Sequence, residues 1–95
     1  MPQTHAEVLV KKIQSEVNRL APQAIFRHDF SNYKDDGADI YVYAPRKVSD
    51  TLRAKLKPIL AAELNRAKGD LKARLIMEDM ENMSAEAKKK YGVPV

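Results

Sequence analysis

The sequence predicts an α+β fold, a two-layer α/β sandwich in which helices lie mainly on one face of a three-stranded sheet. Apolar residues recur at helical spacing in three stretches and alternate with polar residues in three others, and these stretches follow the order α-β-β-α-β-α. The chain has 95 residues, of which 44% are hydrophobic and 32% charged. This balance suits one folded domain over residues 1–95, in which residues 78–95 form either the last helix or a C-terminal helical extension.

The first helix is expected over about residues 5–20. Thr4 and Glu7 have the spacing of a capping box, in which each side chain accepts a hydrogen bond from the backbone N–H of the other. The apolar stripe after this box recurs every three or four positions and consists of Leu9, Ile13, Val17 and Leu20. The helix therefore has one face available for a core.

An antiparallel hairpin is expected after this helix. Residues 24–30 and 39–44 alternate in side-chain character, and the segment of several residues between them contains an Asp-Gly turn signal. His28 falls on the core face of the first strand, where we expect it to be half-buried.

The second helix is expected to have Ser49 as its N-cap and to end just before Gly69. Pro58 lies inside the apolar pattern of this helix, where it removes one backbone donor and its ring clashes with the carbonyl of Ala54. We therefore expect a kink at this proline or a break into two segments.

The third strand is expected over residues 71–77, where apolar residues alternate again, and a last helix is expected after it. The apolar positions of that helix are Met80, Met83, Ala87 and Tyr91. Acidic residues crowd its start and three consecutive lysines its end, which complements the helix dipole.

The two faces of the predicted sheet differ in character, because successive side chains of a strand point to opposite faces. One face joins the helices in a core formed by Leu9, Ile13, Val17, Ile40, Val42, Leu52, Leu56, Leu60 and Leu75. The other face, which we call the open face, carries Ile25, Arg27, Tyr41, Tyr43, Lys72, Arg74 and Ile76. Aromatic and basic residues on a face without helices need an explanation.

Basic charge is concentrated in one part of the chain, whose total net charge is +4. Residues 46–74 hold nine lysines and arginines against three acids, whereas the rest of the chain holds eight bases and ten acids. Such a segment attracts nucleic acid or an acidic partner, or it is the solvated surface of a helix. Arg53 and Lys57 are its candidate binding residues on the second helix.

No residue pattern points to catalysis, a cofactor, a metal ion or a small-molecule substrate. The sequence has no nucleophile elbow, no phosphate-binding glycine loop, no H-E-x-x-H zinc pattern and no cysteine. The aspartates around the hairpin connection lack the spacing of an EF-hand loop, and turns favour aspartate in any case. The spacing of Met77, Met80 and Met83 is typical of a packing stripe. We therefore expect a non-enzymatic protein.

The open face is the candidate binding site, with Arg27, Tyr41, Tyr43, Lys72 and Arg74 as its contact residues. Tyrosine and arginine are enriched in protein interfaces, so this face would suit a homodimer or another protein partner. Aromatic rings beside cations would also suit RNA or DNA, whose bases stack and whose phosphates pair with cations. A third interpretation is a partly exposed sheet that binds nothing, because the amphipathic tyrosine ring tolerates such a position.

From these alternatives we expect a small protein-interaction module that self-associates or belongs to a larger assembly. The alternative is an RNA- or DNA-binding module that uses the basic segment 46–74 and the open face.

The order α-β-β-α-β with a kinked second helix is similar to type II KH domains, especially to the ribosome-binding factor A branch, over about residues 5–78. KH domains usually clamp the RNA backbone with a G-x-x-G loop. This chain has no G-x-x-G motif, and Pro58-Ile59-Leu60-Ala61 stands near the position between the helices. The layout also resembles the soluble domains of cation-efflux transporters. No residue role is carried over from either family.

The sequence favours a cytoplasmic protein without a membrane partner. The absence of cysteine fits a reducing compartment. No apolar run approaches the ~18 residues of a membrane span, and the polar residues 1–7 lack a signal-peptide pattern.

Overall fold

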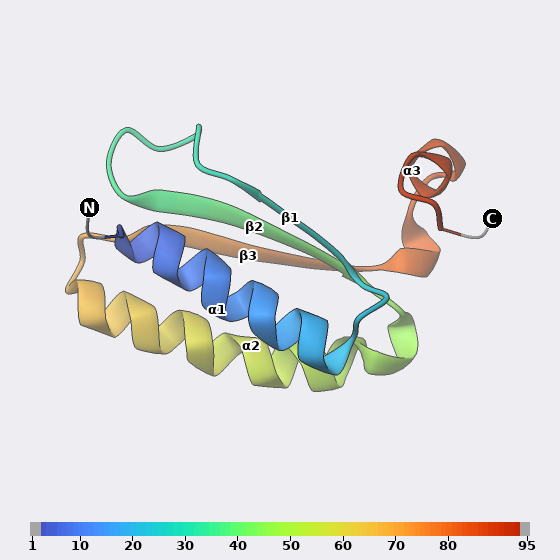
Figure 1. The fold of residues 1–95 in the computed structure, drawn as a ribbon, viewed down its shortest axis with the longest axis horizontal. Coiled ribbons are helices and arrows are strands. Elements are labelled where there is room, and N and C mark those ends of the chain that lie inside the picture. The colour runs from blue at the N-terminus through green and yellow to red at the C-terminus, as the bar shows by residue number, and fades with distance from the viewer. Residues whose placement is uncertain (1–2, 94–95) are drawn as a thin grey trace.

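The computed structural model describes residues 3–93 and has the predicted α+β architecture. Two long helices lie side by side on one side of a three-stranded sheet (Figure 1). The elements in chain order are α1 (His5–Leu20), β1 (Ile25–Asp29), β2 (Gly37–Ala44), α2 (Arg46–Ala67), β3 (Lys72–Asp79), the 3-10 turn η1 (Met80–Asn82) and α3 (Ala85–Lys90). No helix within residues 3–93 combines the length and the apolar character needed to cross a membrane.

β2 is the central strand of the sheet. β1 pairs with it in antiparallel fashion as the predicted hairpin, and Phe26 lies opposite Val42. β3 pairs with β2 in parallel, and Met77 lies opposite Val42 from the other side. A parallel pair needs a long crossover, which α2 provides. The core side of the sheet therefore faces α1 and α2, and the open face turns away from them.

The core lies between the sheet and the two long helices. Seven of the nine predicted core residues are fully buried, from Leu9 on α1 to Leu56 on α2. Leu60 and Leu75 pack against them half-buried. α1 begins at the predicted capping box, so the apolar stripe of this helix and its start are both as expected.

The start of α2 differs from the prediction, because a distant side chain caps it. The helix begins at Arg46, whose backbone N–H donates to the carboxylate of Glu81 at 3.0 Å. Ser49, the predicted N-cap, is instead buried in the first turns, and its hydroxyl donates to Asp79 at 2.7 Å. The sequence around the helix start could not reveal this arrangement, since both carboxylates come from the end of β3 and the turn after it.

Pro58 does not break α2, so of the two expected outcomes, a kink or a break into two segments, the break is wrong. The helix is continuous from Arg46 to Ala67 with the proline inside it. Pro58 and Ala54, whose carbonyl loses its helical partner, both lie on the exposed side, where water can bind that carbonyl. Packing of the apolar side against the sheet holds the helix together across the proline.

The C-terminal helix is shorter than predicted. β3 extends to Asp79, and the next residues form η1 rather than the first turn of a helix. α3 begins after Ser84, whose hydroxyl accepts a hydrogen bond from the N–H of Ala87 at 3.1 Å. Met80 and Met83 therefore lie outside the helix, whereas the lysines stay in its last turn. Residues 94–95, the end of the predicted extension, lie outside the described residues.

β1 reaches beyond the cover of the helices. His28 lies on the core side of the sheet, as predicted, but its side chain is exposed rather than half-buried. Its ring centroid lies 6.1 Å from that of Phe26 and 5.0 Å from that of Phe30. Phe30 is itself 39% exposed. Because β1 is an edge strand, its outer residues escape the core that covers β2.

Candidate functional site

The open face brings the predicted residues of three strands together. Arg27 of β1 lies opposite Tyr41 of β2, which lies opposite Ile76 of β3. The next row across the sheet consists of Ile25, Tyr43 and Glu78. Both tyrosines are half-buried. The strand alternation therefore predicted the centre of this face correctly.

A buried carboxylate holds one of the predicted binding residues. Asp39 of β2 is fully buried, and Arg74 of β3 donates to it twice, from Nε at 2.9 Å and from Nη2 at 2.8 Å. The hydroxyl of Tyr33 and the amide of Asn32 donate to the same carboxylate at 2.6 Å and 2.7 Å. These hydrogen bonds, the one from Arg74 first, hold the pKa of Asp39 well below its usual range. The Asp39 carboxylate in turn raises the pKa of the Arg74 guanidinium.

Arg74 is therefore committed to an ion pair within the chain. Sequence analysis placed Arg74 on the open face but missed its partner. Strand alternation puts Asp39 on the same side of β2 as the tyrosines, which was the available signal. Only the parallel register, in which Asp39 lies opposite Arg74, shows that the two charges meet.

Gly37 allows the loop between β1 and β2 to close over Asp39. A Cβ at this position would meet the ring of Tyr33 and would lie 2.8 Å from the carbonyl oxygen of Lys72. A side chain here would displace the ring whose hydroxyl binds Asp39. The glycine of the Asp-Gly signal thus serves close packing.

α3 frames one end of the open face. The Tyr91 hydroxyl and Nη1 of Arg27 form a hydrogen bond of 2.5 Å, and the guanidinium lies 5.6 Å from the centroid of the Tyr91 ring. A hollow of about 460 Å³ separates α3 from the sheet, with Tyr43 and Glu78 among its lining residues on the sheet side. α3 therefore borders the face at the Tyr43 end rather than covering its centre.

Two of the seven predicted binding residues lie on the other side of the molecule. Arg53 and Lys57 belong to α2, which packs on the core side of the sheet (Figure 1). Arg53 pairs with Asp50 at 3.3 Å, and Lys57 is exposed. The helical part of the basic segment and the open face cannot form one surface, because the sheet and the core lie between them.

Charge divides unequally between these two sides. α1 and α2 carry nine lysines and arginines against four acids, a net charge of +5 in a chain whose total is +4. The charged residues of the open face are Arg27, Lys72 and Arg74 against Asp29, Asp39 and Glu78. The open face is thus balanced, and the excess positive charge lies on the helices.

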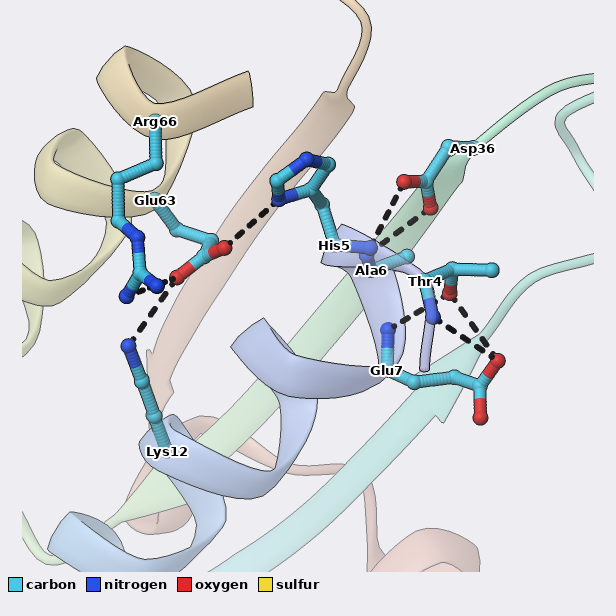
Figure 2. Close-up of polar contacts among 8 residues, drawn as sticks. All are labelled: Thr4, His5, Ala6, Glu7, Lys12, Asp36, Glu63 and Arg66. Atoms are coloured by element: carbon cyan, nitrogen blue, oxygen red, sulfur yellow. Dashed lines mark hydrogen bonds and ion pairs between the residues drawn. The ribbon is translucent and has the colours of Figure 1, made fainter. Parts of the chain in front are cut away.

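A second polar cluster, which sequence analysis missed, joins α1 to the loop before β2 and to α2 (Figure 2). The carboxylate of Asp36 accepts hydrogen bonds from the backbone N–H groups of His5 at 2.8 Å and Ala6 at 2.9 Å, so it caps α1. Glu63 of α2 is buried and accepts from Nδ1 of His5 at 2.9 Å and from Nζ of Lys12 at 3.2 Å. The bond from His5 is the main cause that holds the pKa of Glu63 below its usual range.

Both carboxylates of this cluster are bonded to groups of the same chain, so we interpret it as a structural link between three segments. Within residues 3–93, no three histidine, cysteine or acidic side chains gather in a way that could hold a metal ion. The open face remains the candidate site.

Comparisons of the chain with protein-family models, with curated proteins and with solved structures find no significant match. The likeness to KH domains is therefore one of element order alone.

Proposed function

We propose that this protein is a small non-enzymatic interaction module of the cytoplasm. It binds protein through its open face, either as a second copy of itself or within a larger assembly. The observation that carries the proposal is the centre of that face, where Tyr41 and Tyr43 lie beside Ile25 and Ile76. Half-buried aromatic and apolar side chains of this kind are the ones that stabilise protein interfaces most when a partner covers them.

The charge of the open face supports a protein partner over nucleic acid. Its three bases are matched by three acids, and Arg74 is held by Asp39. Phosphate groups would meet no excess positive charge on the strands of this face, and Lys90 of α3 reaches only the hollow at its Tyr43 end. Mixed charge around an apolar centre is typical of the rim of a protein interface.

The test uses Tyr41→Ala, Tyr43→Ala and Ile76→Ala beside the matched control Gln14→Ala on the exposed side of α1. Sedimentation at several concentrations measures self-association, and copurification measures other protein partners. We expect each open-face variant to weaken association by about 1–3 kcal/mol, because central aromatic and apolar residues carry most interface energy. Association that survives unchanged in all three variants would contradict the proposal.

A second candidate is RNA or DNA binding by the helices, which the charge of +5 on α1 and α2 favours. α1 and α2 contain no tyrosine, phenylalanine or tryptophan, so the contact would involve phosphates rather than stacked bases. Lys55→Ala and Lys57→Ala should then each reduce the slope of log affinity against log salt concentration by about one, because each removes one phosphate contact. Tyr41→Ala should leave this slope unchanged. Binding that is absent at low salt would reject this candidate.

A further inference from the structure

The edge strand β1 offers a second and more specific contact. We propose that two copies of this chain pair in antiparallel fashion along β1, with His28 of each copy opposite His28 of the other. Two three-stranded sheets then become one six-stranded sheet, with both open faces on the same side. The inference rests on the proposed function and deepens it, because it names a second copy as the partner and a strand edge as the contact.

The outer side of β1 is available for pairing. Its inner side pairs with β2 at all five of its residues, and no other strand within residues 3–93 pairs with it. β1 contains neither lysine nor proline, which natural proteins use to block exposed edges, and its two charged residues, Arg27 and Asp29, have opposite signs. α1 and α2 lie on one face of the sheet, and α3 borders the opposite face at one end, where Tyr91 contacts Arg27 (Figure 1). The unpaired N–H and C=O groups of the edge can therefore form a ladder with another strand.

An aromatic row accompanies this edge. Phe26 and His28 lie on the core side of β1 and Phe30 directly follows the strand, with neighbouring rings 6.1 Å and 5.0 Å apart. His28 is exposed and Phe30 is 39% exposed, so the helices of the same chain leave these two rings largely uncovered, whereas Phe26 is half-buried against the core. β3, the other edge strand, has no aromatic side chain. Cover from a second copy at β1 would therefore bury aromatic surface, which β3 does not offer.

Symmetry restricts how two copies of β1 can pair. Identical antiparallel neighbours are related by a two-fold axis perpendicular to the sheet, so one residue meets its own equivalent and opposed residues share a face. An axis at Arg27 would bring two arginines together, and an axis at Asp29 two aspartates. With His28 on the axis, Arg27 of each copy lies opposite Asp29 of the other on the open face. Among these three registers only the one centred on His28 pairs opposite charges.

The same register matches the aromatic row. When the pairing extends one residue past the end of β1, Phe26 of each copy lies opposite Phe30 of the other, on the side of the sheet that carries the helices. Aromatic pairs directly opposite one another are favourable in antiparallel sheets. One register thus satisfies both faces of the strand, with two ion pairs on one side and two aromatic pairs on the other.

Both charged groups keep hydrogen-bonding atoms that this contact can use. Arg27 is exposed and uses Nη1 for Tyr91, which leaves its other nitrogens for a second partner. Oδ1 of Asp29 accepts from the backbone N–H and the hydroxyl of Ser31 at 2.8 Å and 2.6 Å, which leaves Oδ2. The bonds from Ser31 also lower the pKa of Asp29, so this carboxylate is ionised at neutral pH.

The test is a charge swap measured by sedimentation up to millimolar concentration. Arg27→Asp and Asp29→Arg each replace two attractive pairs with two repulsive ones, and each should weaken dimerisation at least about tenfold. The double variant R27D/D29R restores opposite charges in the same register and should return the dimer to near its original strength. Lys55→Asp, an equivalent reversal on the exposed side of α2, should leave the dimer unchanged.

A second measurement remains informative if a swapped variant folds poorly. In the unaltered protein, backbone amides of β1 should exchange with deuterium more slowly as concentration rises, while those of β3 should not respond. A monomer at every concentration, a double variant as weak as the single ones, or β1 amides that do not respond would each overturn the edge proposal.

The same measurements distinguish failure of the edge proposal from failure of the proposed function. A dimer broken by Ile76→Ala but not rescued by the double swap would place the contact on the centre of the open face, so the proposed function would stand and the edge proposal would fail. A monomer that still binds another protein through Tyr41 and Tyr43 would likewise support the proposed function and overturn the edge proposal. A dimer rescued by the swap and indifferent to Ile76→Ala would support the edge and overturn the role of the open face in self-association.

Discussion

At the scale of single residues, Asp39 shows how the open face is held. A fully buried carboxylate is costly unless it is paired, and Asp39 receives hydrogen bonds from three side chains, including both bonds from Arg74. Strand alternation could predict that Asp39 and Tyr41 share a face. It could not predict that Arg74 serves Asp39, because that pairing depends on the register of two strands separated by the whole of α2.

Replacement of Arg74 by methionine should destabilise the fold although the side chain is 64% exposed. The change keeps most of the aliphatic stem and leaves the buried carboxylate without its main partner. We expect a loss of about 1–3 kcal/mol in the free energy of unfolding, measured by urea denaturation. Lys72→Met, on the same strand and face, should stay within about 0.5 kcal/mol. Equal effects of the two changes would contradict the role given to Arg74.

The dependence of stability on pH should report the same carboxylate. The pKa of Asp39 is lower in the folded state than the value of about 3.9 in an unfolded chain. The ionised carboxylate therefore contributes its full stabilisation of the fold above about pH 3.9, and this stabilisation is lost as the pH falls further. Asp39→Asn removes this contribution. The difference in stability between the original protein and the variant should therefore be largest near neutral pH and should narrow below about pH 4. A difference that stays constant down to about pH 2 would count against an ionised Asp39.

At the scale of elements, both long helices begin at carboxylates supplied from elsewhere in the chain. Asp36 lies at the start of α1 and Glu81 at the start of α2. The start of α1 was predictable because its sequence also contains a local capping box, Thr4 with Glu7. The start of α2 was not predictable, because Glu81 caps Arg46 across 35 residues.

Removal of the remote cap should weaken α2. Glu81→Ala takes away the acceptor for the N–H of Arg46 and a negative charge near the helix N-terminus, so we expect a loss of about 0.5–2 kcal/mol by thermal unfolding. Glu78→Ala, an exposed acid on β3 that does not reach the helix start, serves as the matched control. If the control costs as much as Glu81→Ala, the cap is not what stabilises the helix.

Pro58 gives a prediction of opposite sign. α2 is already continuous and the proline is exposed, so Pro58→Ala restores one helical hydrogen bond and removes the clash with the preceding turn. Part of this gain is offset because alanine leaves the unfolded chain more freedom. We expect a net stabilisation of about 1–2 kcal/mol by thermal unfolding. Destabilisation by this change would mean that the proline ring packs favourably where the structure shows it exposed.

At the scale of the whole molecule, the sheet and its core separate two surfaces of different character. The fold class and the strand faces followed from periodicity alone, and most of the predicted core is buried. Sequence position grouped Arg53 and Lys57 with Lys72 and Arg74 in one basic segment, whereas the fold sends the first pair to the helices and the second to the open face. Proximity in sequence cannot show this division, because α2 packs on the core side of the sheet whereas the alternation of side chains along β3 points Lys72 and Arg74 to the opposite face.

The central claim is that the neutral open face binds protein and the basic helices do not carry the main function. The most direct measurement is copurification from native lysate with and without nuclease, using the original protein, Y41A/I76A and K55A/K57A. We predict protein partners that persist after nuclease treatment, are lost with Y41A/I76A and remain with K55A/K57A. The account would be contradicted if the partners were lost after nuclease treatment and with K55A/K57A but were retained with Y41A/I76A. That result would assign the function to nucleic-acid binding by the helices.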